Sequence, residues 1–212
     1  MSVYKRLLLN NASWVKEKQT SEPDYFHQLS QPQHPPFLYL GCSDSRLPID
    51  LFTGANPGEI FIHRNIANQI FLNDMNFLSV LEYAVTVLNV EHIIVCGHYN
   101  CGGVEAAYTG AATGLTKNWV MNIRDLALEN KMELDTYTDM QSRLNRLSEL
   151  NVIRQVRQLC KTSIMTEVFH SGNYPKIHGW VLDIYRGAIK ELVLPIAEWK
   201  QYGLLPADYE KI

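Results

Sequence analysis

The sequence predicts an α/β fold, in which a single domain has a mostly parallel central β-sheet flanked by helices and follows an N-terminal helical arm. Two short apolar runs end at Gly41 and Gly97, as buried strands of a parallel sheet do. A helical pattern lies between two of the predicted strands, and this order indicates a right-handed crossover. The length of 212 residues suits one such domain, so we expect a single domain over residues 1–212.

The N-terminal helical arm and a loop are predicted over residues 1–36. Residues 3–19 carry apolar side chains at helical spacing and contain no proline or glycine. Residues 21–36 are polar and contain prolines, so we expect no regular structure there. The apolar stripe of the helix can pack on its own domain or on a partner, and its periodicity leaves both open.

The first part of the predicted sheet consists of short apolar runs separated by turn or helix signals. The turn signal Asn56-Pro57-Gly58 precedes the second run, and Asn73 or Asp74 can cap the helix that follows it. Strands are therefore predicted at residues 37–41, 59–63 and 92–96, with a helix over residues 75–88 between the last two.

The second half of the chain is predicted to be mostly helical before it returns to the sheet. Residues 104–169 show helical patterns that Asn and Ser interrupt. Residues 176–184 and 188–193 flank the turn Tyr185-Arg186-Gly187, which indicates a strand followed by an edge strand or hairpin.

Composition excludes several classes of protein. The net charge of -3 gives no indication of binding to nucleic acid or anionic membranes. No apolar run approaches the roughly 20 residues of a membrane-spanning helix, and the N-terminus does not resemble a signal peptide, so we expect a cytoplasmic protein. In that compartment four cysteines are expected to stay reduced, and Cys96 and Cys160 lie in apolar patterns typical of buried packing residues.

Chemically capable side chains follow two of the predicted strands. Cys42 comes directly after the strand that ends at Gly41, and His98 and Cys101 come after the strand that ends at Gly97. Ligands bind at the carboxyl ends of strands in open α/β sheets. Two thiolates and one imidazole suit Zn²⁺ and leave its fourth tetrahedral position open, as in catalytic sites.

Asp44 and Arg46 are two residues apart, so in an extended segment both side chains point to the same side. Such a pair can be an ordinary surface ion pair. Beside a metal, the carboxylate can accept a hydrogen bond from bound water or coordinate the ion itself. The guanidinium would then favour keeping the carboxylate off the metal.

Together these residues resemble the β-carbonic anhydrase family. Cys42-Ser-Asp-Ser-Arg46 matches the first family motif, and His98-x-x-Cys101-Gly102-Gly103 matches the second. Further similar segments are Pro57 to Asn68, Glu82-Tyr83-Ala84-Val85 and His178-Gly179-Trp180, so the resemblance runs from about Phe37 to Asp183. It implies a β-carbonic anhydrase-like domain with one Zn²⁺ per chain that reversibly hydrates carbon dioxide to bicarbonate and a proton.

The resemblance also implies a role for each matching position. Cys42, His98 and Cys101 would bind zinc, while Asp44 and Arg46 would orient zinc-bound hydroxide. Asp44 is also the possible fourth zinc ligand of an inactive state. Gln33 would contact substrate from the partner subunit, and the Gly102 amide would contact a bicarbonate oxygen. The small apolar substrate pocket would be lined by Phe61, Ile66 and Tyr83.

The family assembles as dimers or multiples of dimers, so the resemblance implies a homodimer or dimer of dimers with the active site at the subunit interface. The helical arm would then wrap over the partner. Some members also have a non-catalytic bicarbonate site built from Trp, Arg and Tyr. Here Arg64 is in place but Tyr39 and Leu182 occupy the other two positions, so we expect that site to be absent or weakened.

Three other functions remain compatible with the motifs. A hydrolase of carbonyl sulfide or carbon disulfide on the same fold would share the site chemistry. A non-enzymatic zinc or bicarbonate sensor is disfavoured, because a structural zinc normally has a fourth protein ligand. A cysteine nucleophile formed by Cys42 and His98 would need no zinc.

Overall fold

The structure, a computed structural model, describes residues 2–210. Internal contacts divide the chain into two compact units, one ending at Gln33 and the other beginning at His34. Each unit is described separately below. In the described part of the chain, no helix is both long and apolar enough to cross a membrane.

The N-terminal unit consists of two helices, α1 (Val3–Ser21) and α2 (Tyr25–Leu29). The Ser2 hydroxyl caps α1 by accepting a hydrogen bond from the Lys5 amide at 3.3 Å, so the helix predicted over residues 3–19 is confirmed. The helix α2 lies in the stretch that was expected to be a loop. It forms because Tyr25 and Phe26 pack edge-on against Trp14, with ring centroids 6.0 and 5.5 Å away.

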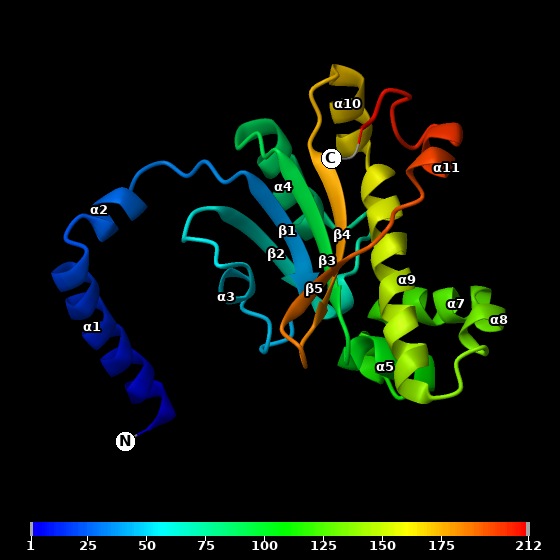
Figure 1. Ribbon diagram of the computed structural model, residues 1–212, viewed down its shortest axis with the longest axis horizontal. Coiled ribbons are helices and arrows are strands. Elements are labelled where there is room, and N and C mark those ends of the chain that lie inside the picture. The colour runs from blue at the N-terminus through cyan, green and yellow to red at the C-terminus, as the bar shows by residue number, and fades with distance from the viewer. Residues whose placement is uncertain (1, 211–212) are drawn as a thin grey trace. The chain divides into compact units, whose positions relative to one another are not determined.

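The second unit is built on a five-stranded sheet in the order β2-β1-β3-β4-β5 (Figure 1). The first four strands are parallel and β5 runs antiparallel to β4, so the predicted, mostly parallel sheet is confirmed. Gly187 makes the β4–β5 turn possible with a φ of 67°. The strands are β1 (Phe37–Cys42), β2 (Ile60–Asn65), β3 (His92–His98), β4 (Lys176–Asp183) and β5 (Ala188–Glu191).

Helices connect the parallel strands and cover the sheet. The predicted helix over residues 75–88 is confirmed as α4 (Met75–Glu82), capped by Asp74, followed by the π-helical turn η2 (Tyr83–Val87). In that turn the Leu88 amide donates to the Tyr83 carbonyl at 3.0 Å. The predicted helical region is confirmed as well; it contains α5 (Gly102–Thr109), α6 (Gly114–Trp119), α7 (Met121–Glu129), α8 (Lys131–Leu134), α9 (Met140–Cys160) and α10 (Ser163–Ser171).

Three short helical segments complete the second unit. They are α3 (Ile49–Thr53) after β1, the turn η1 (Ile66–Asn68) after β2, and α11 (Ile196–Gln201) after β5. Of these, η1 matters most below, because it follows the edge strand and contacts both β1 and β3.

Two apolar clusters lie on the two faces of the sheet. Alternate residues of a strand point to opposite faces, so Leu38 and Leu40 join the cluster of α4 and α9 while Tyr39 joins that of α5 and α7. The helix α9 packs against β3 and β4 (Figure 1). Burial on both faces explains why these strands are nearly continuous apolar runs.

The register of β1 and β3 determines where the site forms. Leu40 pairs with Val95 and Gly41 pairs with Cys96, so the two strands end side by side. Cys42 and His98 are the last residues of their strands rather than the first residues beyond them. Their side chains therefore meet at the carboxyl edge of the sheet.

Candidate metal centre

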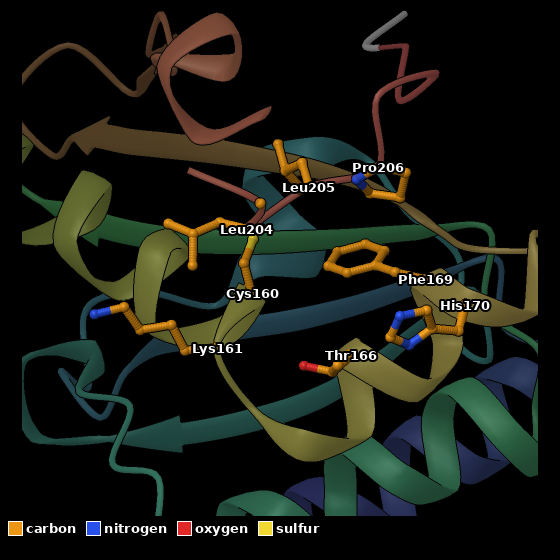
Figure 2. A pocket seen from close by; sticks show the side chains of 9 residues that line it. Cys160, Lys161, Thr166, Phe169, His170, Leu204, Leu205 and Pro206 are labelled. Carbon is orange, nitrogen blue, oxygen red and sulfur yellow. The ribbon is translucent and has the colours of Figure 1, made fainter. Parts of the chain in front are cut away.

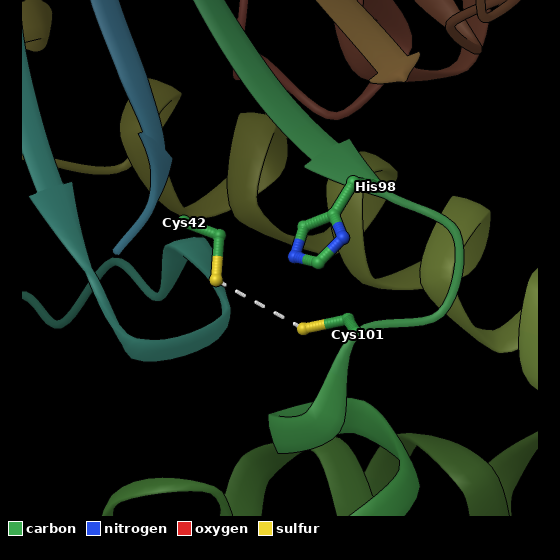
Figure 3. Close-up of side chains that lie close together, drawn as sticks. All are labelled: Cys42, His98 and Cys101. Atoms are coloured by element: carbon green, nitrogen blue, oxygen red, sulfur yellow. Dashed lines mark hydrogen bonds between the residues drawn. The ribbon is translucent and has the colours of Figure 1, made fainter. Parts of the chain in front are cut away.

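Three side chains converge at this edge of the sheet. Cys42 ends β1, His98 ends β3, and Cys101 is the residue from which α5 begins. Their ligand atoms all lie within 4.8 Å of one another, and the two sulfurs are 4.0 Å apart. Figure 3 shows the three side chains pointing toward a common centre from three separate segments. All three residues are buried, so they form a compact pocket of soft donors.

His98 is oriented as a metal ligand by its own backbone neighbour. Its Nδ1 lies 2.9 Å from the Tyr99 carbonyl oxygen, and since a carbonyl only accepts, Nδ1 carries the proton and donates. The other nitrogen, Nε2, is buried and has no hydrogen-bond partner among the described residues. A buried acceptor without a partner is costly, so the Nε2 lone pair fits a metal ion.

The two cysteine thiols shift each other's pKa in opposite directions. The hydrogen bond between the two sulfurs lowers the pKa of Cys42, and His98 lowers it further, although burial opposes the shift. The same hydrogen bond, followed by burial, raises the pKa of Cys101. The pair therefore favours one negatively charged sulfur, and a divalent cation would favour the thiolate form of both.

Backbone amides also face both sulfurs. The Ala67 N–H faces Cys42 and helps to lower the pKa of that thiol, and the N–H groups of Gly103 and Val104, in the first turn of α5, act on Cys101 in the same direction. A helix N-terminus favours negative charge. The donor set and its surroundings therefore fit a zinc site with three protein ligands and an open fourth position.

Asp44 lies beside His98 and is held by Arg46. The guanidinium donates from Nε to Oδ1 at 2.9 Å and from Nη2 to Oδ2 at 2.6 Å, and the Arg46 amide also donates to Oδ1 at 2.9 Å. These bonds hold the pKa of Asp44 well below its usual range. The ionised carboxylate lies 3.8 Å from His98 Nε2, so a molecule held at the centre would lie next to it.

Arg64 fixes the loop that carries Cys42 and Asp44. It extends from β2 and donates to the Cys42 carbonyl at 2.7 Å and to the Asp44 carbonyl at 2.5 Å. Two of its nitrogens are therefore used to hold the backbone of this loop.

Tyr39 and Gly41 form a tight pair behind the loop. Tyr39 is 1% exposed, and a Cβ at Gly41 would lie 2.2 Å from its ring, so only glycine fits there. Burial raises the pKa of the Tyr39 phenol far above its usual value, and the neighbouring Cys96 adds to this shift. Leu182, the other position at which the sequence departs from the family pattern, is buried in the same cluster.

The remaining predicted site residues lie in several places. Phe61 and Tyr83 are neighbours, with ring centroids 5.9 Å apart, whereas Ile66 lies in η1, close to Gly103. Ile66 and Tyr83 are both 43% exposed. Gly102 is the first residue of α5, and a Cβ there would meet no atom within 4 Å, so there is open space on that side of the residue. Gln33 is exposed and belongs to the N-terminal unit.

A pocket of about 350 Å³ lies elsewhere, between the end of α9, α10 and the segment after α11. Figure 2 shows the Cys160, Phe169 and Leu204 side chains facing it. None of the three cluster residues lines this pocket. We therefore assign the chemistry to the edge of the sheet.

Comparison with known proteins agrees with this geometry. The family model described as carbonic anhydrase matches residues 37–189. A carbonic anhydrase of Emericella nidulans is 42% identical over 207 residues, which cover 98% of this chain and 88% of that protein. One of Candida albicans is 34% identical, covering 94% and 71% of the two chains.

Solved structures give the same result. One of two tetrameric β-carbonic anhydrases from Sordaria macrospora superposes with a TM-score of 0.84 at 37% identity, covering 89% of this chain and 96% of that one. A Coccomyxa β-carbonic anhydrase in complex with acetazolamide superposes with a TM-score of 0.87 at 33% identity, covering 98% and 95%.

Proposed function

The chain belongs to the β-carbonic anhydrase family of zinc lyases, and from this premise we propose that it catalyses the reversible hydration of carbon dioxide to bicarbonate and a proton. The observation that carries the proposal is the buried Cys42, His98 and Cys101 cluster. These three residues would hold one Zn²⁺, and the partnerless His98 Nε2 supports that assignment.

Each remaining residue of the site has a separate task. Bound zinc would supply Lewis acidity, which makes water a nucleophile near neutral pH. The ionised Asp44 would accept a hydrogen bond from that water and orient it, and Arg46 would keep the carboxylate in place through both its oxygens. The Gly102 amide would donate to bicarbonate, and carbon dioxide would occupy the apolar surface of Phe61, Ile66 and Tyr83.

Assembly into homodimers or dimers of dimers is part of the proposal, with the active site at the subunit interface and Gln33 supplied by the partner. The Sordaria macrospora relatives are tetrameric, which supports an oligomer. Further support comes from exposed apolar side chains, which lie in the second unit at Ile66, Leu72, Met75 and Tyr83 and on the helical arm at Leu7, Leu8 and Trp14.

The wrapping of the arm over a partner can be tested by truncation. A chain shortened to begin at Gln19 is expected to lose its dimer in sedimentation and most of its hydration activity. A truncated chain that stays dimeric and active would contradict the role of the arm.

Loss of the non-catalytic bicarbonate site is also proposed. The Tyr39 ring lies over Gly41, and Arg64 already donates to two backbone carbonyls, which leaves less capacity for an anion. Bicarbonate is therefore expected to act only as a weak product inhibitor. Strong cooperative inhibition at neutral pH would contradict this part of the proposal.

The catalytic proposal is tested by stopped-flow carbon dioxide hydration with zinc quantified, at pH 7 and pH 8.5, beside a Cys101→Ala control. Zinc near one per chain and rapid hydration, both lost in the control, are the expected results. Zinc bound with hydration at the uncatalysed rate would instead favour the hydrolase of carbonyl sulfide or carbon disulfide, or the sensor. The cytoplasmic location and a role in carbon utilisation stay predictions, and one relative from Arabidopsis thaliana is named as mitochondrial.

A further inference from the structure

The turn η1 contains two residues with left-handed backbone. Ala67 has φ 57° and ψ 32°, and Asn68 has φ 47°. Neither is glycine, and the left-handed region brings Cβ too close to the following carbonyl oxygen. Ala67 is fully buried and Asn68 is 4% exposed, so this conformation is held inside the protein rather than in a free loop. Local strain of this kind persists only where the surroundings enforce it.

The turn lies between the two segments that carry the sulfur ligands. On one side the Ala67 N–H faces the Cys42 sulfur and favours its negative charge. On the other side the Ala67 methyl lies against Gly103, where a Cβ would come within 3.0 Å of it. A change in the φ of Ala67 would turn its N–H away from Cys42 and move its methyl against the start of α5. The left-handed conformation is therefore linked to the geometry of the metal centre.

A buried amide cluster holds the turn from behind; we use this name for Gln69, Asn151 and Gln155. The Ala67 carbonyl accepts two hydrogen bonds, one from Gln69 Nε2 at 2.8 Å and one from Asn151 Nδ2 at 3.0 Å. The Asn151 Oδ1 in turn accepts from Gln69 Nε2 and from Gln155 Nε2, each at 2.9 Å. Two donors on one carbonyl fix the orientation of the Ala67–Asn68 peptide.

Burial makes this cluster unusual. Gln69, Asn151 and Gln155 are only 1–2% exposed, although such amides are mostly found at the surface. Asn151 and Gln155 lie on α9, whose neighbouring buried positions are apolar, such as Val152 and Val156. Apolar side chains would serve packing alone without the cost of burying amides. The cluster therefore has a task that packing does not require.

We propose that Gln69 and Asn151 are positioning residues of the metal centre, which hold Ala67 in the left-handed conformation between the segments that carry Cys42 and Cys101. The inference rests on the proposed zinc site but goes beyond it, because neither residue touches a ligand atom. Outer-shell hydrogen bonds orient metal ligands and adjust their charge, and losing one typically lowers metal affinity about 10- to 100-fold.

The test uses the full-length chain loaded with cobalt, whose thiolate charge-transfer band reports the electron density on the sulfurs. Asn151→Leu removes one donor at similar volume. A hydrogen bond stabilises the sulfur lone pair from which the electron leaves, so its loss is expected to move the band to longer wavelength. Zinc affinity, measured by competition with a chelator, is expected to fall about 10- to 100-fold.

A matched control separates positioning from simple destabilisation. Val156→Ala removes volume from the buried side of α9, in the apolar core, and is expected to lower stability while leaving the band and zinc affinity unchanged. Gln69→Met, which removes the other donor, is expected to shift the band in the same direction as Asn151→Leu. It also provides the test if Asn151→Leu does not fold.

Glycine provides a rescue that a merely structural role does not predict. Glycine adopts the left-handed region without strain, so Ala67→Gly in the Asn151→Leu background is expected to return the band and zinc affinity toward the wild-type values. The positioning role would be overturned if Asn151→Leu and Gln69→Met had the same band position and zinc affinity as the control Val156→Ala. Failure of the glycine rescue would overturn it too. A wild-type chain without a thiolate–cobalt band would instead overturn the proposed zinc site itself.

Discussion

The four cysteines occupy two regions of one unit, and the comparison between the regions explains why only one of them can bind a metal. Cys42 and Cys101 lie at the carboxyl edge of the sheet, whereas Cys96 lies within β3 and Cys160 ends α9. Burial does not separate the pairs, because all four are between 2% and 6% exposed. Their neighbours differ instead.

At the edge of the sheet, each sulfur faces backbone N–H groups, the two sulfurs lie 4.0 Å apart, and the pKa of Cys42 is lowered. In the core, burial raises the pKa of Cys96 and of Cys160 to about 12. Cys160 faces the pocket of Figure 2 beside Phe169 and Leu204. A buried thiol is therefore a candidate metal ligand where a second thiol and an imidazole lie beside it, and an inert packing group where they do not.

The largest effect is predicted for Cys42, one of the two cysteines at the edge of the sheet. Cys42→Ala is expected to lose bound zinc and carbon dioxide hydration, by more than the roughly 10- to 100-fold change typical of an outer-shell partner. Cys96→Ala, a matched loss of a buried thiol in the adjacent strand, is expected to keep both. Metal analysis and stopped-flow assays on the two variants check this. Equal zinc loss in both would mean that the two regions are not distinct.

The second prediction distinguishes the role of the Asp44 carboxylate from that of the cysteine sulfurs. Asp44→Asn keeps the shape of the side chain but removes the charge that Arg46 holds. Hydration is expected to fall by about 100-fold or more, as losses of positioned acid–base groups do, with zinc retained near one per chain. Loss of zinc together with activity would instead assign Asp44 to metal binding.

Glu149 tests whether hydrogen-bond donors also outweigh burial in setting the pKa of a carboxyl group. Burial would raise the pKa of this carboxyl, but hydrogen bonds from Lys190, Tyr99 and Arg146 lower it below its ordinary value. Glu149→Gln is therefore expected to reduce the free energy of unfolding at pH 7 by about 1–3 kcal/mol, because the buried donors lose their charged partner.

The pH dependence of that loss follows from the direction of the shift. A depressed pKa contributes stability that is present above the unfolded value, about 4.3, and lost as the pH falls through the lower folded value. Urea unfolding of wild type and Glu149→Gln should therefore differ most at neutral pH and converge below about pH 4. A difference that is constant over this range would show that the carboxyl charge is not responsible.

The smallest effect is expected at the remaining cysteine. Cys160→Ala removes one buried sulfur next to an existing pocket, so the free energy of unfolding should fall by about 1 kcal/mol with zinc content and hydration unchanged. Urea unfolding combined with metal analysis measures both quantities. A change in zinc content would extend the reactive region to α9.

Most of the sheet and the site edge were predictable from local pattern. Apolar runs ending near Cys42 and His98 identified β1 and β3, and their order placed both residues at one edge because parallel strands share that edge. The inert packing of Cys96 and Cys160 followed from their apolar neighbours in the sequence.

Features that depend on distant contacts were not predictable. The left-handed Ala67 has no local signature, because its carbonyl is held by Asn151, 84 positions away. The helix α2 depends on rings that Trp14 contacts, and the π-helical turn at Tyr83 interrupts a regular helical pattern. The role of Gln33 depends on a second chain, so it rests on the family resemblance.

The parallel pairing of β1 with β3 also has a consequence for the order of folding. Cys42 and Cys101 are 59 positions apart, and the strands that precede them, β1 and β3, pair only across a long intervening segment. The complete ligand set therefore cannot assemble until this long loop closes. Zinc captured by all three ligands would then stabilise only chains that have already passed this step. The moment of tight metal uptake during refolding would therefore record when the centre of the sheet forms.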